Sequence, residues 1–483
     1  MSEKNKVAHG FAWRFAERIT SQGMAFIISV LLARLLEPSE FGVVAMIQVF
    51  ITLSDIFITG GITSALIQKK DADDLDFSTI LYCNLSISAL LYALLFVFAP
   101  AIATFYKMPE LVKLVRVYSL ILLLFGYNSV QVAWVSRHMV FRKFFISTAS
   151  ATFVSGIIGV AMAFAGFGVW ALIAQTMSKT LINMMVMRHI IDWRPKLVFS
   201  WTRAKSLGTY GINILATHLL GTGCNEIRQL LIGKLYSPGD LAFYNRGHHF
   251  PRLFTSNIDA SLNSVLFPAM SNHSDDPVRI KAMTRRAMRT SSFFLFFALT
   301  TLAVCSRPLV SILLTDKWLP CVPYMQLMCI GSMLASVSTA NLQAIKALGR
   351  SDVALKLELV KKPVFLLMIV VAANISVMAL AVSVPLYSLY AALVNMRPNK
   401  KFLGYGYWEQ FRDYLPATAL SMAMCAVACT TSLLSCNMAV LLASRLAICF
   451  GTYLGLAALF KVETLEYAMS FWRDKRLRRR ARA

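Results

Sequence analysis

The chain has 483 residues, of which 57% are hydrophobic and 15% are charged, and its formal net charge is +24 at pH 7. Soluble domains carry about 25% charged residues, so this composition excludes a soluble globular protein and indicates an integral membrane protein. The basic residues lie in short connections between long apolar runs rather than in a contiguous soluble domain, and we therefore expect no nucleic-acid partner.

The apolar runs predict an all-α integral membrane protein with about fourteen transmembrane helices, because many runs are near the roughly 20 residues that span a bilayer. In chain order the expected spans are residues 11–35, 41–67, 77–104, 110–135, 144–165, 167–190, 206–232, 241–270, 289–315, 320–346, 355–374, 376–396, 413–434 and 437–460. The first run is expected to remain as a helix rather than be cleaved as a signal, because a second run follows closely without a small-x-small cleavage site.

Charge in the connections predicts the orientation. If the N-terminus lies in the cytoplasm, most Lys and Arg residues fall in connections on the cytoplasmic side, as the positive-inside rule requires. This asymmetry predicts an even number of spans, with the N- and C-termini both cytoplasmic. The connections that carry these cations are 69–70, 137–143, 188–205, 279–286, 346–356 and 397–401, together with the tail 473–482.

An internal repeat relates two parts of the chain at an offset of two hundred positions. Residues 31–42 (LLARLLEPSEFG) align with 231–242 (LIGKLYSPGDLA), keeping the Pro and the basic and acidic positions. Because each half holds an even number of spans, both copies enter the membrane from the same side, and the halves are expected to be parallel repeats around a central cavity. The predicted organisation is an N-lobe of six spans (1–190), an interfacial linker (191–205), a C-lobe of six spans (206–396), an extra two-helix unit (397–460) and a basic cytoplasmic tail (461–483).

Polar side chains follow one face of several expected spans, at steps of three and four residues. Polar groups within a membrane are costly and usually face a bundle interior or a water-filled cavity. The candidate substrate-binding residues of the cavity are Arg14, Arg18, Asn225, Arg228, His248 and Arg252. The alternative role for Arg14 is to snorkel to the lipid headgroups. The alternatives for Arg228 are to anchor the helix at the membrane edge or to pair with Glu226.

Three acidic residues within expected spans are candidates for proton or sodium coupling: Glu17, Asp55 and Asp259. Pairing with an Arg is the alternative role for each. Adjacent His248 and His249 point about 100° apart on a helix, so a shared metal ion is not expected. No cofactor and no metal are predicted.

Enzymatic chemistry is not expected. The sequence contains no GxxxxGK[ST] nucleotide loop, no HExxH and no GxSxG. The acidic cluster Asp71, Asp73, Asp74 and Asp76 is better explained as a solvated loop beside Lys69 than as a catalytic group. The nine cysteines lie mostly within apolar runs, where they behave as small hydrophobic residues.

Several segments resemble one transporter family. They are LLARLLEPSEFGVVAM (31–46), SALIQKK (64–70), SVLFPAMS (264–271) and LLTDKW (313–318). With them, nearly the whole chain resembles the polysaccharide flippases of the multidrug/oligosaccharidyl-lipid/polysaccharide exporter superfamily, especially the exopolysaccharide, or colanic-acid-exporter, type. The resemblance implies a multi-pass protein of the bacterial cell inner membrane that flips an undecaprenyl-diphosphate-linked oligosaccharide outward for surface polysaccharide biosynthesis. It also implies partnership with polysaccharide polymerase and chain-length proteins.

The residues are consistent with an anionic cargo moved by alternating access. Guanidinium groups bind phosphate oxygens in a fork, which explains Arg rather than Lys in the candidate cavity. Two alternatives remain: a multidrug–cation antiporter of the same superfamily, which requires a carboxylate-rich cavity, and a membrane glycosyl- or acyltransferase. Whether protons, sodium or the membrane potential alone drives transport is left open by the sequence, as is the sugar carried.

Overall fold

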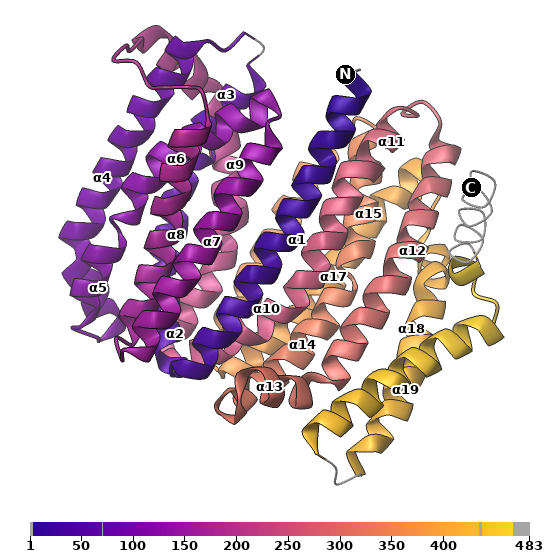
Figure 1. The fold of residues 1–483 in the computed structure, drawn as a ribbon. Helices are drawn as coiled ribbons and strands as arrows, with labels where there is room; N and C mark the ends of the chain where they lie inside the picture. The colour runs from indigo at the N-terminus through magenta and orange to yellow at the C-terminus, as the bar shows by residue number, and fades with distance from the viewer. Residues whose placement is uncertain (1–2, 70, 434–436, 467–483) are drawn as a thin grey trace, which may run out of the picture. The chain divides into compact units, whose positions relative to one another are not determined.

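The computed structural model describes residues 3–69, 71–433 and 437–466, except for the side chains of 3–16, 18–19, 68, 210, 213, 220 and 432–433. Every regular element in these ranges is helical (Figure 1). The chain forms two compact units, Met1–Ala242 and Phe243–Ala483, which are described separately below.

The N-terminal unit contains nine helices within its described residues. They are α1 (Glu3–Leu35), α2 (Pro38–Thr59), α3 (Ile62–Gln68), α4 (Asp74–Tyr106), α5 (Leu111–Tyr118), α6 (Ile121–His138), α7 (Phe141–Phe164), α8 (Val169–Ile190) and α9 (Trp201–Leu235). Helix α7 packs against α1 and α8, and α9 packs against α2, α3 and α4. By its contacts α9 belongs to the N-terminal compact unit. The division into lobes on either side of the linker 191–205 stays a prediction.

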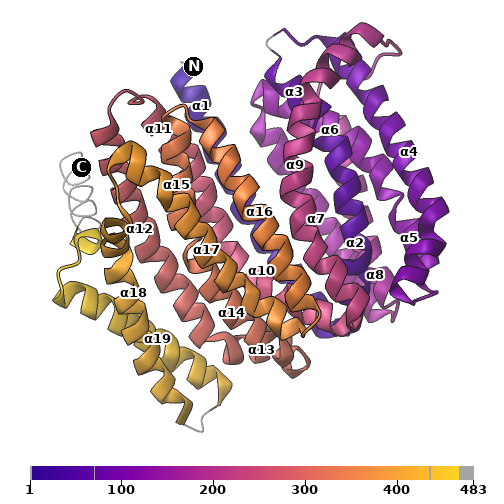
Figure 2. The same cartoon turned by 180° about the vertical axis from the view of Figure 1, so that it is seen from behind.

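Helix α10 (Pro238–Ser261) begins in the N-terminal unit and continues into the C-terminal one. The remaining α-helices are α11 (Phe267–Ser271), α12 (Pro277–Val304), α13 (Ser306–Leu314), α14 (Val322–Met333), α15 (Ala335–Ala347), α16 (Ser351–Ala373), α17 (Val377–Leu403), α18 (Tyr407–Cys429) and α19 (Met438–Leu459). Helix α12 contacts α14, α15, α17 and α18, and α16 lies beside α17 (Figure 2). The expected extra pair of spans corresponds to α18 and α19, which pack against each other.

Eight helical segments of the described chain are long and apolar enough to cross a membrane. They are Pro38–Ile67, Asp74–Tyr106, Leu111–His138, Phe141–Phe164, Pro277–Val304, Asp316–Ala347, Val377–Leu403 and Met438–Leu459. The structure therefore confirms an all-helical membrane protein. The six further spans expected from the sequence stay a prediction, because helices such as α9 and α10 carry many polar side chains that lower their mean hydropathy.

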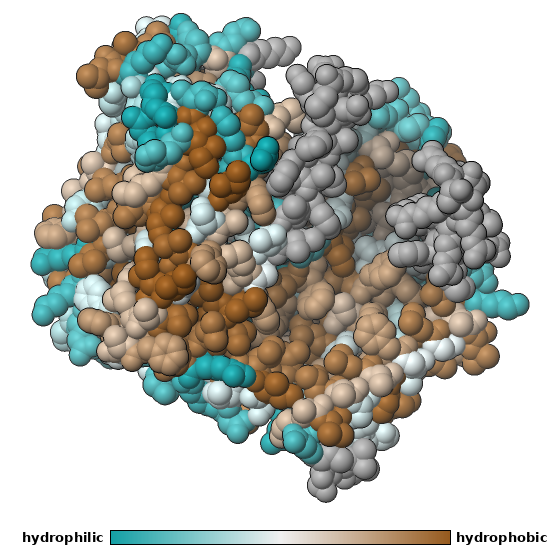
Figure 3. All heavy atoms as spheres, viewed as in Figure 1, coloured by the Kyte–Doolittle hydropathy of each residue, from teal (hydrophilic) through white to brown (hydrophobic). Residues whose placement is uncertain are grey.

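The outer surface of the N-terminal unit is suited to lipid. Large apolar side chains on α4 and α7 are exposed, among them Leu90 (66%), Val97 (69%), Phe153 (58%) and Ile157 (56%). Figure 3 shows hydrophobic side chains over the face of this unit, with hydrophilic ones gathered near the helix ends. An exposed apolar patch of this extent in a folded chain is typical of a membrane-facing surface.

The two copies of the repeat adopt the same helix–turn–helix. Helices α1 and α9 end at Leu35 and Leu235, and α2 and α10 begin at Pro38 and Pro238. Pro suits this first helical position because its missing N–H would have no helical partner. Each turn is closed by an acidic side chain: Glu40 accepts a hydrogen bond from the backbone N–H of Glu37 at 2.8 Å, and Asp240 does the same for Ser237 at 3.2 Å.

The two turns also touch each other within the N-terminal unit. A Cβ atom added at Gly42 would lie 1.8 Å from the carbonyl oxygen of Pro238. That distance is far inside van der Waals contact, so any side chain at residue 42 would push the turns apart. Gly42 is therefore required by this close approach.

The linker 191–205 is held against α4. The ring of Trp193 packs on Phe77 at 5.9 Å, and the hydroxyl of Tyr82 donates to the carbonyl of Lys196 at 3.2 Å. The Lys196 ammonium also pairs with Asp74 at 2.7 Å. Aromatic and basic side chains thus fix this connection on the N-terminal unit.

Candidate functional site

The polar face of α1 contacts α7 in the N-terminal unit. The hydroxyl of Thr148 on α7 lies 3.4 Å from the carboxylate of Glu17 and 3.5 Å from the hydroxyl of Ser21. The half-buried Lys179 on α8 lies within electrostatic range of Glu17. A cation carried by another helix thus acts electrostatically on this acidic candidate.

Arg14 and Arg18 belong to the same helix, α1, but their side chains lie outside the described residues. Their helical spacing, four residues apart, places them on one face of α1 with Ser21. Their role in binding stays a prediction.

Helix α2 carries the second polar face. The amide of Gln48 donates to Thr52 at 3.3 Å, and its carbonyl accepts from the Tyr118 hydroxyl at 2.5 Å. Asp55 is half-buried one turn further along, and the Thr59 hydroxyl donates to its backbone carbonyl at 2.9 Å. The side chain of Gln48 is thus committed to packing within the unit, whereas the role of Asp55 in coupling stays a prediction.

Helix α9 presents two of the candidate binding residues. Asn225 is exposed and Arg228, almost one turn later, is half-buried. The nearby Glu226 accepts a hydrogen bond from Gln229 at 2.8 Å. Asn225 and Arg228 therefore lie close together on one helix of the N-terminal unit.

The polar side chains along one face of α10 form two groups with different environments. Toward its C-terminal end, Asp259 accepts a hydrogen bond from Thr339 on α15 at 2.9 Å, and Asn263, in the following π-helical turn (Leu262–Leu266), accepts one from Gln343 of α15. Nearer its start, His248 and Arg252 are exposed. They lie four residues apart, on the same face of the helix.

Arg252 is the exposed guanidinium of this stripe, and no described carboxylate forms an ion pair with it. Its neighbour Arg246 has a different environment: it is buried (8% exposed), and its guanidinium lies 4.8 Å from the centre of the Trp318 ring. Arg252 is thus suited to bind an anion, whereas Arg246 is part of the packing.

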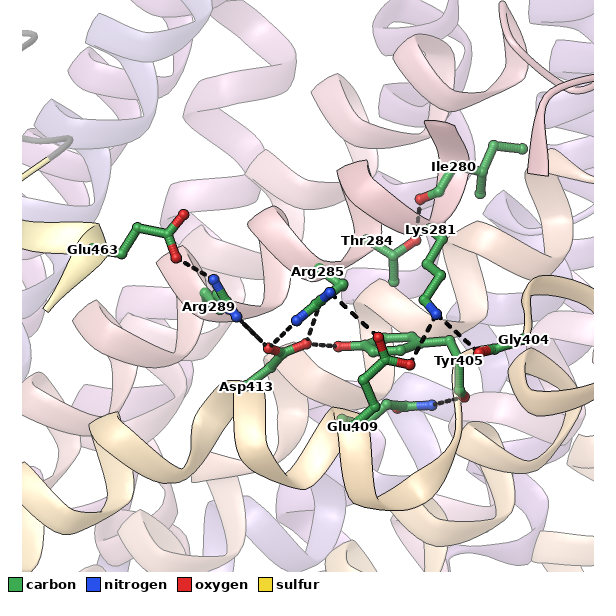
Figure 4. Close-up of polar contacts among 11 residues, drawn as sticks. Ile280, Lys281, Thr284, Arg285, Arg289, Gly404, Tyr405, Glu409, Asp413 and Glu463 are labelled. Carbon is green, nitrogen blue, oxygen red and sulfur yellow. Dashed lines mark hydrogen bonds and ion pairs between the residues drawn. The ribbon is translucent and has the colours of Figure 1, made fainter. Parts of the chain in front are cut away.

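A second polar cluster, which the sequence did not single out, connects α12 to α18 (Figure 4). The side chain of Asp413 is only 1% exposed and accepts hydrogen bonds from three donors. They are Arg285 (Nε, 2.8 Å), Arg289 (Nη2, 2.6 Å) and the Tyr405 hydroxyl (2.6 Å). Arg289 also pairs with Glu463, beyond α19. A buried carboxylate needs its hydrogen-bond donors to offset the loss of hydration, and all three donors are engaged with Asp413. This cluster therefore holds α18 on α12 rather than binding cargo.

The acidic cluster beside Lys69 is structural. Asp73 caps α4 by accepting from the backbone N–H of Asp76 at 2.9 Å, and it pairs with Arg203 at 2.6 Å. These two donors lower the pKa of Asp73 to about 2. The fully buried Asp76 pairs with Lys69 at 2.7 Å. These carboxylates thus have cationic partners, and no metal-binding group of three His, Cys, Asp or Glu side chains occurs in the described chain.

Solved structures identify the fold. The lipid II flippase MurJ, in its inward closed conformation, matches with a TM-score of 0.77 at 14% identity, covering 95% of this chain and 100% of that one. An inward-facing multidrug resistance MATE family transporter of the MOP superfamily matches with a TM-score of 0.56 at 14% identity, covering 80% and 94%. The chain therefore has the fold of these multi-pass membrane transporters.

Sequence comparison then gives the family. The polysaccharide biosynthesis protein model matches residues 31–323, and the chain belongs to this family, which is one of transporters rather than enzymes. The succinoglycan biosynthesis transport protein ExoT of Rhizobium meliloti is 23% identical over 72% of this chain and 70% of its own. The lipopolysaccharide biosynthesis protein WzxC of Escherichia coli is 23% identical over 88% of both chains. The flippase resemblance predicted from the short motifs is confirmed.

Proposed function

We propose that this chain moves an undecaprenyl-diphosphate-linked oligosaccharide from the cytoplasmic to the periplasmic leaflet of the bacterial inner membrane. Membership of a polysaccharide biosynthesis transport family supports the class of cargo. The observation that carries the proposal is the exposed face of α10, where His248 and Arg252 are set in an otherwise apolar membrane protein. A guanidinium exposed within a membrane chain suits a diphosphate, which it binds through two parallel hydrogen bonds.

Each step has a physical requirement. The polyprenyl tail is as apolar as lipid, so only the sugar and diphosphate need a hydrated path. Arg252 would bind the diphosphate, and Arg14, Arg18, Asn225 and Arg228 are the further candidates for binding the head. Alternating access of two lobes would then carry it across. An inside-negative membrane potential favours the outward movement of an anion by about 2.3 kcal/mol per charge per 100 mV.

Coupling to protons or sodium would use Asp55 or Asp259. Glu17 is the weaker coupling candidate, because the Lys179 ammonium lies within electrostatic range of it. The rival proposal, export of cationic drugs, calls for a carboxylate-rich cavity, whereas the candidate lining contains more Arg than acidic residues. We propose that polysaccharide polymerase and chain-length proteins are the partners that receive the flipped unit. We also propose that both termini lie in the cytoplasm.

Reconstitution tests the proposal. The purified chain is placed in liposomes with a fluorescent prenyl-diphosphate oligosaccharide, and an impermeant quencher reports the fraction in the outer leaflet. We expect exchange between leaflets that a diphosphate headgroup inhibits and that cationic drugs leave unchanged. Inhibition by cationic drugs alone would instead favour the antiporter.

A further inference from the structure

A basic pocket lies in the C-terminal unit, where α16 begins and α17 ends. Its volume is about 610 Å³. Among its lining residues five are cationic and one is acidic: Arg350, Lys356, Arg397, Lys400 and Lys401, with Asp352. Asp352 is already paired with Arg350 at 3.1 Å, so the lining keeps an excess of positive charge.

The walls of the basic pocket are fixed by packing. The guanidinium of Arg350 and the ammonium of Lys401 lie 4.8 Å and 5.8 Å from the centre of the Phe402 ring. Deeper in the helix pair, the rings of Phe365 and Tyr387 pack at 4.8 Å and hold α16 against α17. Two of the cations thus lie against one ring, and the others are carried by two helices that pack on each other.

An exposed apolar face of α17 leads directly away from the basic pocket. Leu386 (55% exposed), Leu389 (48%) and Leu393 (45%) follow at steps of three and four residues, and the next steps reach Arg397 and Lys400. Side chains at these steps share one side of a helix. One stripe thus changes from lipid-like to cationic where the helix ends.

Helix α16 repeats this arrangement beside α17 (Figure 2). Lys356 is exposed near its start, and Leu359 (61%), Val360 (55%) and Leu367 (65%) are exposed further along. The two helices together have a cationic end that can accommodate a lipid headgroup and an apolar face that can contact acyl chains. This combination matches a phospholipid better than a free anion.

We propose that the basic pocket binds the phosphate headgroup of an anionic phospholipid, with the acyl chains lying along the exposed apolar faces of α16 and α17. Phosphate oxygens accept charge-assisted hydrogen bonds from Arg and Lys, and basic pockets between membrane helices are suited to such headgroups. The site is separate from the α10 stripe assigned to cargo, and it does not depend on the cargo's identity.

Native mass spectrometry of the full chain tests this inference. The protein is released from detergent with phosphatidylglycerol or phosphatidylcholine, and lipid adducts are counted over a lipid titration. We expect one phosphatidylglycerol to bind in preference to phosphatidylcholine. The Arg397→Gln/Lys400→Gln variant is expected to weaken this binding roughly 30-fold, because each cation near a headgroup contributes about a fivefold factor and two are removed.

The control removes two exposed cations elsewhere, Lys205→Gln/Arg279→Gln, and should leave the binding unchanged. Equal losses in both variants would show only diffuse attraction and would overturn the proposal. Displacement by inorganic phosphate at the same phosphate concentration would make the pocket a simple anion site. Preferential displacement by a polyprenyl diphosphate would make it a cargo site. Either displacement would overturn the assignment to phospholipid.

Discussion

Replacement of Asp413 by Ala is expected to detach α18 from α12. The buried carboxylate pairs with Arg285 and Arg289 and also accepts a hydrogen bond from the Tyr405 hydroxyl. In the variant, two guanidinium groups and a phenol lose a shared partner. The helix pair α18–α19 packs on the C-terminal unit partly through this cluster, and its docking should weaken.

The size of the effect follows from burial. Removing one partner of a buried ion pair costs about 3–5 kcal/mol. The side chains of Arg285 and Arg289 are 36% and 32% exposed, so water can solvate them in part. Arg285 also keeps its ion pair with Glu409, and Arg289 keeps its pair with Glu463. We therefore expect the lower end, about 3 kcal/mol. At about 2–4 °C per kcal/mol for a cooperative unit of this size, the Tm should fall by roughly 6–12 °C.

Thermal unfolding of the purified chain in detergent measures this change. It is monitored through the reaction of buried cysteines with a fluorogenic maleimide. The fully buried Cys449 lies on α19 and reports release of the helix pair. Glu463→Ala is the control, because its side chain is 77% exposed and an exposed ion pair contributes about 1 kcal/mol or less. Equal, small shifts in the two variants would refute the reasoning that burial makes Asp413 the organising residue.

Three further predictions concern transport, measured by leaflet exchange at matched membrane levels. Arg252→Ala should reduce transport roughly 10- to 100-fold through loss of a charge-assisted contact, and normal transport would remove Arg252 from the site. Arg18→Lys should reduce it roughly tenfold if the fork geometry matters, whereas full activity would leave only a point-charge role. Gly42→Ala should slow exchange roughly tenfold, because the added methyl group overpacks against Pro238 at a cost of about 1–3 kcal/mol. Gly23→Ala is the control and should be neutral, because a Cβ atom at residue 23 meets no atom within 4 Å. Equal effects of the two variants would disprove the role of the contact.

Local features of the chain were predictable from the sequence. The repeat offset located both helix–turn–helix copies, because Pro at the first helical position and an acidic residue two positions later are local signals. The helical periodicity also placed His248 and Arg252 on one face of α10. Such patterns depend on neighbours within a few residues, and the sequence contains them directly.

Features that depend on tertiary packing were not predictable. Asp413 and Arg285 are 128 positions apart, and nothing local to either residue identifies the other. The pairing of Asp259 with Thr339 and the approach of Lys179 to Glu17 have the same origin. The packing of α9 on α2, α3 and α4 likewise depends on side-chain contacts that periodicity alone does not specify.

The most direct test of the central claim is made in the native host with this gene deleted. Spheroplasts are treated with an impermeant glycan label, and undecaprenyl-diphosphate oligosaccharide is quantified in each leaflet. We predict accumulation in the inner leaflet with loss of surface polymer, restored by the wild-type chain and not by the Arg252→Ala variant. An unchanged distribution between leaflets, with new sensitivity to cationic compounds, would contradict the account.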